Sequence, residues 1–162
     1  NMINNIDRHG DKPSLLIGSW GSWEDTPSDE ISAILQIIND LRNDTENIAI
    51  LLPWKNSVQR YVFALNDHVD DFSFYYEDRH RFPEGCPLLK NVHITTFKSA
   101  KGLEFDTVIV PDFNIMPSIV GRHYNVDWQD FYVGCTRARS NLFLFSNNNL
   151  PSLNGVVEIS RI

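Results

Sequence analysis

Two stretches of the chain combine hydroxyl, basic and glycine residues in patterns that suit phosphate chemistry. The first covers residues 95–106 and reads Thr-Thr-Phe-Lys-Ser-Ala-Lys-Gly-Leu-Glu-Phe-Asp. A predicted strand ends at Thr96 or Phe97, and the turn after it offers backbone N–H groups, hydroxyls and lysines to phosphate oxygens. In an open parallel sheet, ligands bind beyond the carboxyl ends of the strands, where this turn falls. The same residues also fit an ordinary solvated turn.

The second stretch covers residues 131–139 and reads Phe-Tyr-Val-Gly-Cys-Thr-Arg-Ala-Arg. We interpret it as the end of a helix that carries Arg137 and Arg139. An arginine fixed there can reach a phosphate across an interface, as an arginine finger does in phosphoryl transfer. Two solvated surface arginines are the alternative interpretation.

Strands and helices alternate along the chain, which predicts an α/β domain with right-handed crossovers. Apolar residues at helical spacing predict helices around residues 31–38, 58–65 and 128–135. Residues 48–52 form a continuous apolar run, typical of a strand buried on both faces of a parallel sheet. The other predicted strands are residues 15–18, 72–76, 92–97, 107–110, 141–145 and 156–159.

Polar and proline residues mark where these elements begin and end. Thr26 as N-cap and Pro27 at the first helical position predict the start of the first helix, and residues 43–45 predict its end. Asn125 or Asp127 is predicted to cap the third helix. Residues 77–91 contain two prolines, a glycine and several charges, so we expect a loop there.

Composition predicts one globular domain over residues 1–162, with 42% hydrophobic and 22% charged residues. The net charge of −7 disfavours a broad nucleic-acid-binding surface. However, residues 1–91 carry 8 basic and 15 acidic side chains, whereas residues 92–162 carry 6 of each. Any phosphate-facing surface is therefore expected in the second half.

Several other classes of protein are disfavoured. No apolar run approaches the roughly 20 residues that span a bilayer, and no signal peptide is visible, so we expect a cytoplasmic protein without membrane contact. Cys86 and Cys135 lack the spacing of metal or redox sites and fit ordinary reduced thiols. The histidines show no ligand spacing, so no metal site is predicted. Three tryptophans fit either base stacking or packing, of which packing is favoured: Trp20, Trp23 and Trp54.

Taken together, the two stretches resemble motifs V and VI of UvrD/Rep-type superfamily 1 DNA helicases. Motif V of that family has the core Ser-Ala-Lys-Gly-Leu-Glu-Phe-Asp, and motif VI has the pattern Tyr-Val-x-x-Thr-Arg-Ala-Arg. The order of the two stretches, their spacing and the strand that follows also fit. The resemblance implies the second motor domain of such a helicase, with a RecA-like three-layer fold of the P-loop NTPase type and a mainly parallel sheet.

The resemblance also implies roles for matching residues. Arg137 matches the catalytic arginine that reaches the γ-phosphate of ATP. Gly102, Leu103 and Glu104 match the part of motif V beside the nucleotide, with the glutamate near the ribose. The residues that match the contact with the single-strand backbone are Thr96, Lys98 and Ser99.

The sequence departs from the family pattern in several places. Lys98 stands where many relatives have His, and Gly134 and Cys135 stand where relatives have small apolar residues. No Gly-x-x-x-x-Gly-Lys-[Ser/Thr] pattern occurs, so ATP with Mg²⁺ is expected to bind mainly to an N-terminal RecA-like domain of the same polypeptide. The chain is then a fragment of a larger protein. About 26 residues separate Leu65 from Val92, which leaves no room for the large domain that Rep-like members insert there.

These observations predict the C-terminal motor domain of an ATP-dependent DNA helicase or translocase, expected to be bacterial and inactive alone. Its expected partner is single-stranded DNA or a single-strand/double-strand junction. The alternative is a non-hydrolysing RecA-like module that binds nucleic acid or protein. A Walker A motif upstream in the same gene would favour the helicase. A fold without a parallel RecA-like sheet would favour an unrelated α/β domain.

Overall fold

A computed structural model describes residues 12–20, 28–41, 47–78, 84–85, 91–115, 127–148 and 157–161. In these ranges, none of the helices has the length and apolar character that crossing a membrane requires. Some of the residues named above, and two of the histidines, lie outside the described ranges: Trp23, Thr26, Pro27, residues 43–45, His80, Cys86, His123 and Asn125.

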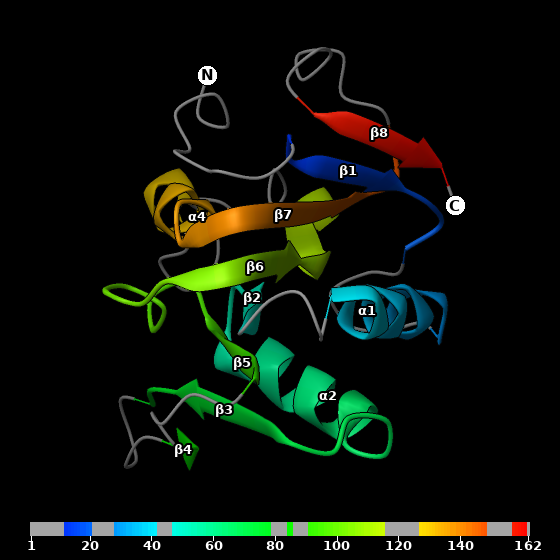
Figure 1. The fold of residues 1–162 in the computed structure, drawn as a ribbon. Coiled ribbons are helices and arrows are strands. Elements are labelled where there is room, and N and C mark those ends of the chain that lie inside the picture. The colour runs from blue at the N-terminus through cyan, green and yellow to red at the C-terminus, as the bar shows by residue number, and fades with distance from the viewer. Residues whose placement is uncertain are drawn as a thin grey trace.

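One mainly parallel sheet organises the fold (Figure 1). The strands lie in the order β4-β3-β5-β2-β6-β7-β1-β8, and every neighbouring pair is parallel except β3 and β4. The predicted α/β class with a mainly parallel sheet is therefore confirmed. The strands are β1 (Ser14–Ile17), β2 (Ile48–Leu52), β3 (Phe72–Tyr76), β4 (Glu84–Gly85), β5 (Val92–Thr96), β6 (Phe105–Val110), β7 (Ala138–Ser146) and β8 (Glu158–Arg161).

Several predicted boundaries were wrong, and the last strand, for example, begins at Glu158 and not at residue 156. Residues 77–91 are not entirely a loop, because β4 pairs in antiparallel fashion with the end of β3. Strand β6 begins at Phe105, two residues earlier than predicted, and β7 begins at Ala138, three residues earlier. Arg139 therefore lies on a strand rather than at the end of a helix. The start of β7 was missed because its first four residues are only partly buried, and the polar residues there do not form an apolar run.

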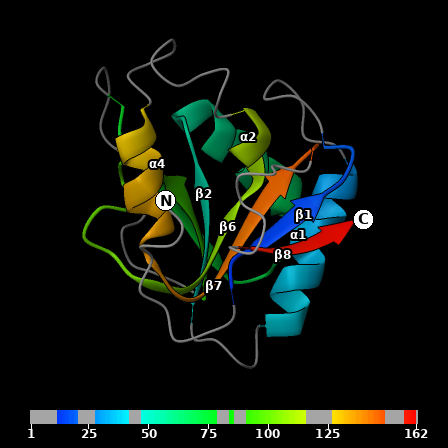
Figure 2. The ribbon, with the colours of Figure 1, turned by 90° about the horizontal axis from the view of Figure 1, so that it is seen from above.

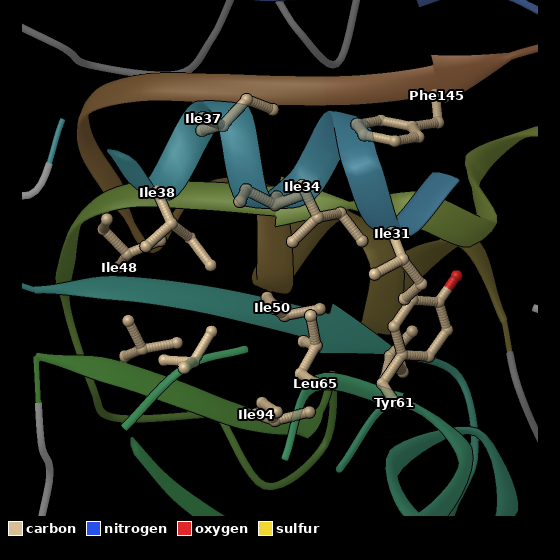
Figure 3. Packing of buried hydrophobic residues seen from close by; sticks show 14 of the residues in the cluster. Ile31, Ile34, Ile37, Ile38, Ile48, Ile50, Tyr61, Leu65, Ile94 and Phe145 are labelled. Carbon is tan, nitrogen blue, oxygen red and sulfur yellow. The ribbon is translucent and has the colours of Figure 1, made fainter. Parts of the chain in front are cut away.

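Helices α1 (Ser28–Leu41) and α2 (Lys55–Leu65) pack on the same side of the sheet. The apolar stripe of α1 faces β2, where Ile34 and Ile38 lie over Ile48 and Ile50 (Figure 3). Each such fully buried side chain contributes about 1.5–3 kcal/mol to stability. All five residues of β2 are buried, as its continuous apolar run predicted.

Helix α4 (Trp128–Cys135) lies on the opposite side of the sheet from α1 (Figure 2). Asp127 caps it by accepting a 2.8 Å hydrogen bond from the backbone N–H of Asp130, which confirms this predicted cap. Phe131 is buried and meets the ring of Phe97 edge-on, with 5.8 Å between centroids. The short 3-10 helix η2 (Pro111–Ile115) adds Phe113 to the same core.

Candidate functional site

The connection from β5 to β6 passes over β2, which lies between them in the sheet. We call residues 97–104 the crossover loop. A connection between parallel strands must return from the carboxyl end of the sheet to its amino end, and it usually does so through a helix. Here a series of turns replaces the helix. The loop is anchored where the N–H of Phe97 donates to the carbonyl of Leu52 over 3.0 Å and the Phe97 ring enters the core.

The three residues predicted to contact DNA lie together where β5 ends. Thr96 is the last residue of the strand, and its hydroxyl oxygen accepts the N–H of Ser99 over 3.1 Å. The N–H of Ala100 donates to the Thr96 carbonyl over 3.1 Å, which tightens the same turn. Lys98 is exposed. The turn therefore presents one ammonium group and has its backbone fixed by the preceding threonine.

Two lysines of the crossover loop face one carboxylate on α4. Lys101 Nζ lies 3.5 Å from Oδ1 of Asp130, and Lys98 Nζ lies 3.9 Å from Oδ2. The side chain of Lys98 is 52% exposed and that of Lys101 is 54% exposed, whereas that of Asp130 is only 7% exposed. The carboxylate thus sits beneath the two ammonium groups and ties the loop to the first turn of α4.

The far end of the crossover loop meets Arg137. The N–H of Phe105 donates to the Arg137 carbonyl over 2.8 Å. The guanidinium donates to the carbonyls of Val133 (3.2 Å) and Leu103 (3.5 Å) and to the Thr136 hydroxyl (3.3 Å). These bonds satisfy one carbonyl in the last turn of α4 and fix the arginine against the loop.

The other residues predicted to face the nucleotide share this end of the loop. Gly102 has a φ of +83°, which side chains with a Cβ rarely adopt, so this turn depends on glycine. Leu103 packs against the core, and the side chain of Glu104 is exposed. The structure therefore brings Gly102, Leu103, Glu104 and Arg137 together.

Helix α4 connects the two ends. Its eight residues span about 12 Å. Asp130 lies in its first turn, beside Lys98, and Arg137 follows its last turn, beside Leu103. The residues predicted to bind DNA and those predicted to bind nucleotide thus lie at opposite ends of one loop–helix unit.

Close packing between the loop and α4 accounts for Gly134. A Cβ on this residue would lie 2.8 Å from Cδ1 of Phe97 and 3.3 Å from Cδ1 of Leu51. Real Cβ contacts are essentially never as short as 2.8 Å. A glycine at this position allows the helix to approach the loop.

Arg139 has a structural contact instead of a place beside Arg137. Its Nη2 lies 3.0 Å from Oδ1 of Asp106, on the neighbouring strand β6. The other carboxylate oxygen of Asp106 accepts the N–H of Asn47 over 3.2 Å. Arg139 is therefore neither beside Arg137 nor simply solvated, because it forms an ion pair with a carboxylate.

The remaining candidates have packing roles. Trp20 is buried, donates from Nε1 to the Leu16 carbonyl over 3.0 Å, and has its ring 4.8 Å from that of Phe145. Cys135 is fully buried, which raises the pKa of its thiol. Burial lowers the pKa of His93 to about 4, and its Nδ1 lies 2.7 Å from the Ser73 hydroxyl. Among the described residues, no group of three or more His, Cys, Asp or Glu side chains could hold a metal ion.

Sequence reasoning missed Asp130. Residues 92–162 carry equal numbers of basic and acidic side chains, so a carboxylate partner for Lys98 and Lys101 could be expected. Several acidic residues could have filled that role. The position of Asp130 three residues after the cap, next to buried Phe131, would have narrowed the choice. The pairing itself depends on how α4 packs on the loop.

Comparisons with known proteins found similar helicase sequences. Residues 64–149 match the model of the UvrD-like helicase C-terminal domain, a segment that includes both the crossover loop and α4. The chain is 30% identical over 120 residues to a proposed ATP-dependent DNA helicase, R568, of Acanthamoeba polyphaga mimivirus, covering 64% of this chain and 17% of that protein. It is 38% identical over 105 residues to the RecBCD enzyme subunit RecB of Chlamydia pneumoniae, covering 64% of this chain and 10% of that protein.

A solved structure shares the fold. The C-terminal domain of a proposed DNA helicase from Lactobacillus plantarum superposes with a TM-score of 0.59 at 21% identity, covering 99% of this chain and 92% of that one. The matches to the mimivirus and Chlamydia relatives span less than a fifth of each protein's length. The family model covers more than half of the chain, and the chain therefore belongs to the UvrD-like helicase C-terminal domain family.

Proposed function

We propose that the chain is the C-terminal motor domain of an ATP-dependent DNA helicase or translocase. It would supply motif V, in the crossover loop, and motif VI, at the end of α4. The observation that carries the proposal is the loop–helix unit, which holds the candidate nucleotide residues at one end and the candidate DNA residues at the other. ATP with Mg²⁺ would be held mainly by an N-terminal motor domain of the same polypeptide.

The chemistry of Arg137 fits one end of a triphosphate. A guanidinium has five N–H donors. Within the described residues, three hydrogen bonds engage Nε, Nη1 and Nη2 once each, so one N–H on each terminal nitrogen remains for a phosphate oxygen. Within the same set of residues no carboxylate pairs with Arg137, so its positive charge is not offset by a neighbouring negative charge. Arg137 would neutralise charge that develops on the transferred phosphoryl group.

At the other end, Thr96, Lys98 and Ser99 would contact the backbone of a single strand. Hydroxyl, ammonium and backbone N–H groups all suit phosphate oxygens and carry no base preference. The contact would be narrow, since this half of the chain has no excess of basic residues. Affinity for DNA would therefore be moderate and dependent on salt.

The test replaces Arg137 by Ala in the full-length protein and measures ATPase activity with saturating single-stranded DNA. Loss of an arginine finger lowers turnover by a factor of about 10³ or more, and we expect a loss of that order. Arg139→Ala is the matched control, because Arg139 is an arginine two residues away with a structural contact. That variant should stay within a few-fold of the unmodified protein.

Two results would contradict the proposal. Full DNA-stimulated activity in the Arg137→Ala variant would exclude the finger role. A full-length protein that binds single-stranded DNA but never hydrolyses ATP would instead support the non-hydrolysing module. DNA binding by the Arg137→Ala variant, measured in the same preparation, shows whether the protein is folded.

A further inference from the structure

The carboxylate of Asp130 occupies an unusual place at the DNA end of the loop–helix unit. The carboxylate is nearly buried, yet the two positively charged groups that pair with it are exposed. They are the ammonium groups of Lys98 and Lys101. Among the described residues, Oδ2 has no hydrogen-bond partner and is fully covered. The ammonium group paired with this oxygen is that of Lys98, 3.9 Å away, and Lys101 pairs with Oδ1 at 3.5 Å.

One carboxylate and two ammonium groups together carry a net charge of +1. A buried charge without a partner is costly, so Asp130 favours conformations in which the lysines stay close. A phosphate that binds the same lysines must approach a negative charge a few ångströms away, and at this distance repulsion between like charges is substantial near a protein surface. The carboxylate and the phosphate therefore compete for the same cations.

We propose that Asp130 is a positioning residue that holds Lys98 and Lys101 over the crossover loop and competes for them with the backbone of single-stranded nucleic acid. This inference rests on the proposed function. Asp130 lowers the affinity for the strand and so keeps binding reversible. A motor that moves along DNA requires such reversible binding. Because Asp130 lies in the first turn of α4 and Arg137 follows its last turn, a displacement of α4 at the nucleotide end would also change the distance between the carboxylate and the lysines.

The experiment measures binding of the full-length protein to a fluorescent oligo(dT) over a range of salt concentrations. Asp130→Asn removes the charge and keeps the shape, so one more cation is free to neutralise a phosphate. We expect affinity at low salt to rise roughly 3- to 10-fold and the slope of log K against log[salt] to become steeper by about 0.7. Asp130→Glu retains the charge and should restore the original slope.

A matched control comes from another carboxylate that pairs with a lysine. Asp78 has a side chain that is 9% exposed and lies 2.7 Å from Lys55, a lysine that does not belong to the crossover loop. Asp78→Asn should leave both the affinity and the salt slope unchanged. In the Asp130→Asn background, replacing Lys98 and Lys101 by Met should abolish the gain, which ties the effect to these two cations.

The outcomes separate the inference from the proposed function. A folded Asp130→Asn variant with unchanged or weaker binding and an unchanged slope would overturn the inference and leave only a scaffolding role for Asp130. A full-length protein with no affinity for oligo(dT), whether or not the lysines are present, would overturn the proposed DNA contact itself. A steeper slope that Asp130→Glu reverses would support both.

Discussion

The guanidinium of Arg137 donates to the carbonyl of Leu103 over 3.5 Å, which joins the candidate finger directly to the crossover loop. A second contact between the same segments is the 2.8 Å bond from the N–H of Phe105 to the Arg137 carbonyl. The crossover loop and the residues that follow α4 are therefore held together at this end. A movement of the loop would displace the arginine, and a movement of the arginine would displace the loop.

Arg137→Lys should lose nearly as much ATPase activity as Arg137→Ala. Lysine keeps the positive charge, but its single ammonium cannot reproduce the planar fork that contacts two carbonyls and a hydroxyl while presenting further N–H groups. The measurement is DNA-stimulated ATP turnover by the full-length variant. Activity close to that of the unmodified protein would mean that charge alone, without the fork, is sufficient.

Local sequence patterns predicted the elements whose residues face a uniform environment. The apolar run of β2 and the stripes of α1 and α2 predicted the sheet and the helices that cover it. A strand buried on both faces is apolar throughout, and a helix buried on one face is apolar at helical spacing. The two motif stretches gave the candidate site residues, whereas their places at the two ends of α4 came only from the structure. The two-residue strand β4 could not be predicted, since it is too short for any period.

Contacts between distant segments were not predictable from the pattern. Asp130 meets lysines from a different connection of the sheet, and Arg139 meets Asp106 through the register of β6 and β7. Gly134 was noted only as a departure from the family pattern, whereas the distance from its hypothetical Cβ to Phe97 gives the reason for it. Such pairings follow from how the elements pack, which sequence periodicity does not specify.

Gly102→Ala should lower the free energy of unfolding by about 1–2 kcal/mol, because a Cβ disfavours the backbone conformation at φ +83°. Among the described residues, apart from its two neighbours in the chain, no atom lies within 4 Å of the added Cβ, so the loss would come from the backbone conformation. Gly102→Asn is the matched variant, since Asn adopts positive φ more readily. Urea unfolding should show a smaller loss for Asn than for Ala, and equal losses would contradict the strained-turn explanation.

Gly134→Ala should also destabilise the protein, but for a steric reason. Overpacking costs about 1–3 kcal/mol, whereas replacing glycine by alanine within a helix gains at most about 1 kcal/mol. We therefore expect a net loss of about 1 kcal/mol in urea unfolding. Phe97→Leu should relieve the clash, so the double variant should be more stable than the two single losses predict. A stabilising Gly134→Ala would show that α4 lies farther from the loop.

Two buried groups should give opposing pH dependences of stability. His93 has a folded-state pKa of about 4 against 6.5, because burial disfavours its charged form. Between these pH values the unfolded chain binds a proton that the folded chain does not, so stability falls on acidification by up to about 3 kcal/mol. Burial raises the pKa of Asp112 from 3.8 to about 6, against the opposing effect of Arg60. Here the folded chain binds the proton, so stability rises on acidification by a similar amount.

The two effects nearly cancel in the unmodified protein, and single substitutions should separate them. Asp112→Asn removes the buried carboxylate, so the variant should be more stable than the unmodified protein at pH 7.5 and should lose stability steeply between pH 6.5 and 4.5. His93→Gln should do the opposite and gain stability over the same range. Urea unfolding at a series of pH values tests both, with the unmodified protein as the nearly flat reference. Parallel pH profiles for all three proteins would show that neither group has a shifted pKa, because linkage requires the slope to change when a perturbed group is removed.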